Sequence, residues 1–135
     1  CDDIIDKYVN QSLGRIIHHA PVTQDQVPDI LNQANILVSV GNSTTSFKPS
    51  KLFEYLATGK PILHINQSNQ HDDVLEKYPL GLQIYPGKLS ETDTAVDMQL
   101  FCKAHADKQL PWESVNSLFS HHSLENIRNT ILSNA

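Results

Sequence analysis

Residues 36–65 read ILVSVGNSTTSFKPSKLFEYLATGKPILHI. The run 36–40 is apolar almost throughout and stops at Gly41, which is typical of a strand covered on both faces of a parallel sheet. Residues 49–57 follow a polar loop, begin with proline and carry an apolar side at helical spacing, which predicts a helix. Because residues 61–65 predict another strand, the stretch indicates a strand, loop, helix and strand of one parallel sheet.

The same alternation continues on both sides of this unit. Before it, we expect a helix carrying Ile4, Ile5, Tyr8 and Val9, a short buried strand over 15–19, and a helix that Thr23 can cap. After it, we expect a short helix ending at Tyr78, a strand over 81–85, and helices over 94–106 and 112–133. The pattern predicts an α/β fold, with a Rossmann-like parallel sheet of about four strands, right-handed crossovers and helices on both faces.

Composition narrows the classes of function. A chain of 135 residues, 39% of them hydrophobic, suits a single domain over 1–135. With 15 acidic and 10 basic residues the formal charge is -5, which argues against nucleic acid as a partner. Cys1 and Cys102 form no CxxC pairing, and no apolar run approaches the roughly 20 residues that a bilayer requires, so we expect a cytoplasmic location. Because the chain lacks an initiating Met, we expect a truncated domain of a longer protein.

The start of the helix predicted over 49–57 carries the most chemistry. A helix opening at Pro49 directs unpaired backbone N–H groups, its positive dipole end, the Ser50 hydroxyl and the Lys51 ammonium beyond the sheet edge, as in an anion site. Glu54 lies four residues after Ser50 and three after Lys51, so these side chains can share a face. A carboxylate at this place would suit the diol of a ribose.

Both charged side chains also have a structural interpretation. Glu54 can be a solvent-exposed group paired with Lys51 or Lys60, an interaction worth about 0.3–0.5 kcal/mol. The spacing does not choose between ribose binding and this ion pair. Lys51 can be a surface lysine without a ligand, although its place at a helix start favours a phosphate.

The run from Pro49 to Pro61, PSKLFEYLATGKP, resembles a signature of the group 1, retaining GT-B-type glycosyltransferases of bacterial polysaccharide synthesis. The resemblance extends upstream over 27–40 and downstream through 78–81 to the segment 122–125, so it covers most of the chain. It implies the carboxyl-terminal, donor-binding domain of such an enzyme. It also implies that Glu54 holds the ribose hydroxyls.

The resemblance suggests further contacts with the donor. It implies that Pro49 to Lys51 lie against the diphosphate and that the loop Ala20-Pro21-Val22 borders the base. Many members carry a second glutamate eight positions before the ribose-binding one, touching the donor sugar, and this chain has Ser46 there. The neighbouring segment Asn42-Ser43-Thr44-Thr45 can offer hydrogen bonds to sugar hydroxyls, or it can be an ordinary polar loop.

The implied reaction is transfer of a glycosyl group from a nucleotide diphosphate sugar, of the UDP type, to a hydroxyl of a saccharide or lipid-linked acceptor. Lys51 is the candidate for neutralising the leaving diphosphate in a metal-independent site. The groups that contact the acceptor would come from an amino-terminal domain, so we expect the chain alone to be inactive. Membrane association, peripheral to the inner face, would belong to the parent protein.

Other signals carry less weight. The adjacent pairs His18-His19 and His121-His122 do not share a face, and the triplet 71–73 makes a poor cation cage, so we expect neither a metal nor a cofactor. His64 can reach the carboxyl edge of the sheet, but a hydrogen-bonded core histidine is the favoured interpretation. Two alternatives stay open, a non-catalytic module that binds nucleotide sugars and a fragment of a sugar-nucleotide epimerase.

Overall fold

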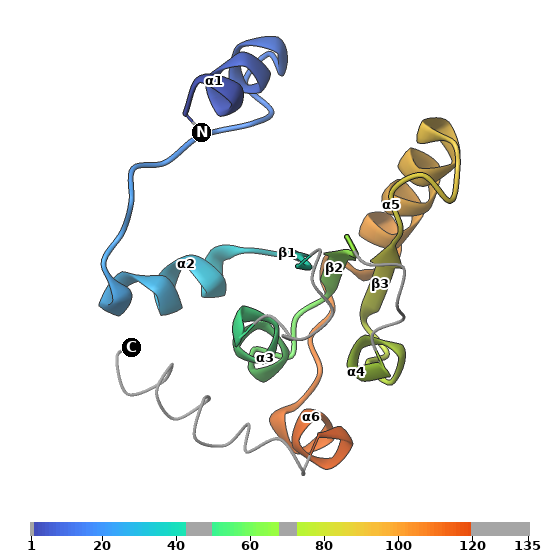
Figure 1. The fold of residues 1–135 in the computed structure, drawn as a ribbon. Coiled ribbons are helices and arrows are strands. Elements are labelled where there is room, and N and C mark those ends of the chain that lie inside the picture. The colour runs from blue at the N-terminus through green and yellow to red at the C-terminus, as the bar shows by residue number, and fades with distance from the viewer. Residues whose placement is uncertain (1, 43–49, 68–72, 120–135) are drawn as a thin grey trace.

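The computed structural model describes residues 2–42, 50–67 and 73–119, drawn in colour in Figure 1. In chain order, its elements are α1 (Asp2–Gln11), the 3-10 helix η1 (Gln24–Gln26), α2 (Val27–Gln33), β1 (Leu37–Val40), α3 (Ser50–Ala57), β2 (Ile62–Ile65), α4 (Asp73–Glu76), β3 (Gly81–Ile84), α5 (Glu91–His105) and α6 (Trp112–Leu118). Among the described residues, no helix is both long enough and apolar enough to span a membrane. The chain is a mixed α/β structure.

The sheet has three parallel strands in the order β1-β2-β3. Leu37 pairs with Ile62, which pairs with Gly81, and the register runs on to Val40, Ile65 and Ile84. These are the strands predicted over 36–40, 61–65 and 81–85. A helix precedes the second and the third strand, as parallel pairing requires.

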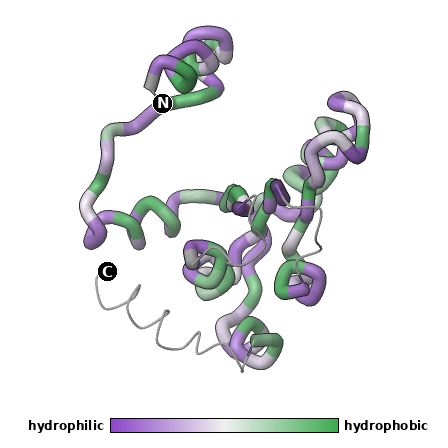
Figure 2. Tube along the Cα trace, in the orientation of Figure 1, coloured by the Kyte–Doolittle hydropathy of each residue, from purple (hydrophilic) through white to green (hydrophobic). Residues whose placement is uncertain are grey.

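The strand predicted over 15–19 is wrong, so the described residues form a sheet of three strands and not about four. Residues 15–19 form irregular, exposed chain between α1 and η1. Figure 1 shows α1 and this segment apart from the sheet, and Figure 2 shows that both contain hydrophobic residues. A strand exists only with a neighbour to pair with, and the local run of Ile16 and Ile17 could not reveal that this neighbour is missing.

The core lies on one face of the sheet, under α3, α4 and α6. Its buried members are Leu52, Leu56, Ile62, Val74, Leu75, Tyr78, Leu80, Val115 and Phe119. Because α3 and α4 share this cluster with Ile62, both crossover helices cover the same face. Tyr78 contributes a ring 6.3 Å from that of Phe119 and a hydroxyl that donates to the backbone oxygen of Lys60 at 2.8 Å.

The opposite face is covered only in part within the described ranges. Helix α5 contacts β3 and begins three residues before the predicted start at Thr94, capped by Ser90, whose hydroxyl accepts a hydrogen bond from the Asp93 N–H at 3.1 Å. At the other edge, Val38 and Val40 of β1 are 53% and 51% exposed. The expectation of helices over both faces is therefore confirmed near β3.

Candidate functional site

The candidate site is the carboxyl edge of the sheet, where the chain leaves each strand. Gly41 and Asn42 follow β1, Asn66 follows β2, and Tyr85 follows β3. The ladder continues one step beyond the strands, because the Gly41 N–H donates to the Ile65 oxygen at 2.8 Å and the Asn66 N–H donates to the Ile84 oxygen at 2.7 Å. These bonds fix the backbone of Gly41 and Asn66 at the edge where ligands of α/β sheets bind.

Helix α3 points its amino end toward this edge. The chain leaves β1 at the carboxyl edge and enters β2 at the amino edge, so the helix between them runs antiparallel to the strands. Leu52 and Leu56 are fully buried on its inner side. The amino end of α3, which is the positive end of its dipole, therefore faces the carboxyl edge, as an anion site requires.

The two charged candidates on α3 are accessible. Lys51 is exposed and Glu54 is half-buried. Within the described part of the chain, neither is joined to the other or to Lys60 by an ion pair. The proposed pairing of Glu54 with a lysine is therefore not the arrangement in this structure.

Lys60 is engaged elsewhere. Its Nζ donates to the carbonyl oxygens of Asn32 and Ala34, both at 2.6 Å, where it caps the carboxyl end of α2. Partial burial lowers the pKa of this ammonium below its usual value. Lys60 is thus a structural cation that ties α2 to the turn after α3.

The structure places the predicted site residues in three groups. Asn42, Lys51, Glu54 and the backbone of Ser50 belong to the β1 and α3 unit at the carboxyl edge. Pro49, Ser43 and Ser46 lie outside the described residues. Pro21 and Val22 are exposed in the segment before η1, and the expectation that they border the base of the donor stays a prediction.

A row of polar side chains crosses the sheet near this edge and was not predicted as a unit. Ser39, His64 and Gln83 are partners in the ladder, so they lie side by side on one face. Ile62, two residues before His64, packs against α3, and this places the row on the α3 face. The signal was present in the sequence, because each is the third residue of a four-residue strand.

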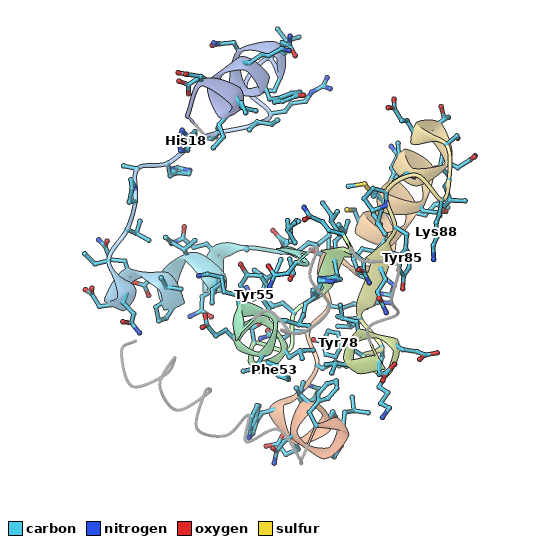
Figure 3. The ribbon with its side chains drawn as sticks, in the orientation of Figure 1. His18, Phe53, Tyr55, Tyr78, Tyr85 and Lys88 are labelled. Carbon is cyan, nitrogen blue, oxygen red and sulfur yellow. The ribbon has the colours of Figure 1, made fainter. Side chains whose placement is uncertain are left out.

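A small pocket of about 230 Å³ lies at the far edge of the sheet, between β3 and α5. Its lining is Leu82, Gln83, Ile84, Tyr85, Lys88, Leu89, Thr94 and Asp97. The Lys88 ammonium sits 3.9 Å from the centre of the Tyr85 ring, and Figure 3 shows these side chains together at the end of β3. The Tyr85 hydroxyl donates to Gln83 Oε1 at 3.0 Å, which connects the pocket wall to the polar row.

Metal chemistry finds no support in the described ranges 2–42, 50–67 and 73–119, where no group of three or more His, Cys, Asp or Glu side chains is placed to hold an ion. The Nδ1 atom of His18 lies 3.9 Å from Oδ1 of Asp6 in α1, and Figure 3 shows His18 apart from the sheet. No family model, curated protein or solved structure matches this chain.

Proposed function

We propose that this chain is the donor-binding part of a GT-B-type glycosyltransferase and holds a nucleotide diphosphate sugar at the carboxyl edge of the sheet. The observation that carries the proposal is the direction of α3, whose amino end faces this edge with an exposed Lys51 and a half-buried Glu54 that forms no ion pair with a described lysine. Lys51 and the backbone N–H groups of the first turn bind the diphosphate. Glu54 accepts hydrogen bonds from the ribose hydroxyls.

The electrostatic role of this helix follows from where charge develops. When the glycosyl bond breaks, negative charge moves onto the leaving nucleoside diphosphate. A helix amino end and an ammonium that are in place before the reaction stabilise that charge without reorganising. The intact enzyme transfers the glycosyl group to a saccharide or lipid-linked hydroxyl, and this chain alone binds the donor without turnover.

Calorimetric titration with UDP, GDP and their sugar conjugates tests the proposal. We expect weak, saturable binding of one nucleotide, reduced at least about tenfold by Glu54→Gln or by Lys51→Met, since a lost hydrogen bond to a charged group costs about 1.5–3 kcal/mol. Glu113→Gln and Lys108→Met, which alter exposed side chains around the start of α6, serve as matched controls and should leave binding unchanged.

Two results would contradict the proposal. One is the absence of binding to every nucleotide both by this chain and by a longer chain that includes the residues preceding it. The other is binding that the α3 substitutions and the α6 controls affect equally, because the site would then lie elsewhere.

A further inference from the structure

His64 lies at the junction of the polar row and the candidate site. Only 2% of its surface is exposed, and its ring leans along the strand toward the carboxyl edge. A Cβ added at Gly41 would lie 3.1 Å from Nε2 and 3.3 Å from Cε1 of this ring. The missing side chain at position 41 therefore leaves room for the imidazole, which lies over Gly41 where the chain leads into the site.

The chemistry of the two sheet faces makes this arrangement specific. In the same ladder rows, the face opposite α3 carries only aliphatic residues: Val38, Val40, Leu63, Ile65, Leu82 and Ile84. On the α3 face, the ladder row that contains Ile62 has no polar side chain. The next row on this face, nearer the carboxyl edge, contains Ser39 and His64, which are only 4% and 2% exposed. Burying polar groups costs free energy that aliphatic residues would not cost. This cost is located only where the strands approach the candidate site.

We propose that His64 is a positioning residue, whose imidazole holds the Gly41-Asn42 backbone at the carboxyl edge so that the groups following β1 and the amino end of α3 face one ligand. That a ligand binds at this edge rests on the function proposed above. The positioning itself is a property of the free protein. His64 is too deeply buried to contact the ligand directly, so it acts through Gly41 and Asn42.

The positioning is tested first without a ligand, by NMR-detected amide exchange at Gly41 and Asn42. His64→Leu keeps the volume but removes the nitrogen atoms, and His64→Gln restores a polar group near the place of Nε2. We expect exchange at both amides to rise about tenfold in the leucine variant and to stay within about threefold in the glutamine variant. His105→Leu, which removes a histidine ring lying 4.9 Å from that of Phe101 on α5, is the control and should leave both amides unchanged.

A space-filling role predicts the reverse result. If His64 only fills the core, leucine should protect the two amides at least as well as glutamine does, and that outcome overturns the inference. Equal loss of protection in both variants also overturns it, because the polar atom would then have no role.

If His64→Leu does not fold, a double-mutant cycle between positions 41 and 64 tests the same inference. Gly41 is not among the glycines with positive φ, so alanine is acceptable to its backbone and the Gly41→Ala effect comes from the contact with the ring. We expect Gly41→Ala to increase Asn42 exchange in the wild-type background, and to have little effect beside His64→Ala, where the space is free. Additive effects in this cycle contradict the inference.

UDP affinity then separates the two proposals. If the wild-type chain binds UDP, His64→Leu should weaken binding about tenfold and His64→Gln less than about threefold. Loss of amide protection without any UDP binding in the wild type rejects the proposed ligand and leaves the positioning role standing. If UDP binds the wild type and both His64 variants with the same affinity, the positioning role is rejected and the proposed function still stands.

Discussion

Leu110 donates its backbone N–H to the carbonyl oxygen of Gly59 at 2.8 Å, which joins the turn after α3 to the segment that leads into α6. The Leu110 carbonyl approaches so closely that a Cβ at position 59 would overlap its oxygen. Gly59 also has φ of 71°, in the left-handed region that favours glycine. This contact allows Val115 and Phe119 of the α6 region to pack on α3.

Gly59→Ala should lower the free energy of unfolding by about 2–4 kcal/mol, because backbone strain and the collision with Leu110 add together. Gly87→Ala is the matched control, since Gly87 also has positive φ, at 83°, but open space around it. We expect the control to cost only the strain, about 1 kcal/mol. Urea unfolding measures both, and equal losses would show that the contact with Leu110 is unimportant.

Tyr78→Phe should destabilise the fold by about 1 kcal/mol, because it removes the hydroxyl that donates to the Lys60 carbonyl inside the core. Thermal or urea unfolding checks this value. Tyr8→Phe on the exposed helix α1 is the comparison, and it should change the stability by less than about 0.5 kcal/mol. A loss of equal size in both variants would contradict the role given to the buried hydroxyl.

The same side chain predicts a pH dependence. Burial raises the pKa of the Tyr78 phenol well above its ordinary value of about 10. The folded state therefore favours the protonated form, so its contribution is complete below about pH 10 and is lost as the pH rises beyond that. Unfolding of the wild type between neutral and strongly alkaline pH should show this decline, and Tyr78→Phe should show a shallower one. Identical pH curves for the two proteins would argue against it.

Leu52→Ala should cost about 2–5 kcal/mol, because it opens a cavity under α3 at a side chain with no exposed surface. Leu118→Ala removes the same number of atoms from a partly exposed position at the end of α6, and we expect a loss below about 1.5 kcal/mol. The ratio of the two losses in urea unfolding tests whether the core lies where the structure places it.

Lys60→Met should loosen α2 without unfolding the protein, since it removes the ammonium that binds the Asn32 and Ala34 carbonyls. The side chain is only partly buried, so we expect a global loss below about 1 kcal/mol. Amides of residues 27–34 should exchange faster, as hydrogen exchange with mass spectrometry can measure. Lys108→Met leaves α2 untouched and is the control, and unaltered exchange in Lys60→Met would contradict the anchoring.

Much of the secondary structure was readable from the chain itself. The apolar runs over 36–40 and 61–65 and the punctuation by Gly41, Gly59 and Pro61 are local signals, and a local signal is sufficient to begin and end an element. The direction of α3 also followed, because a helix between parallel strands can run only one way. The positions of Lys51 and Glu54 relative to the carboxyl edge were therefore predictable, while their binding role stays a prediction.

What only the tertiary structure decided depends on residues far apart in the chain. The segment 15–19 has the composition of a strand, but pairing needs a free neighbour, and this segment pairs with none of the three described strands. Lys60 could have met Glu54, yet its Nζ reaches two carbonyls that lie 26 and 28 residues earlier in the chain.

His64 shows most clearly what the sequence determines and what only the tertiary structure determines. Its place in a strand was determined by the sequence, through the period of the residues around it. The position of its ring in the space that a side chain at position 41 would need was decided by the register of β1 against β2. Register is set by packing across the whole sheet, and no local pattern contains that information.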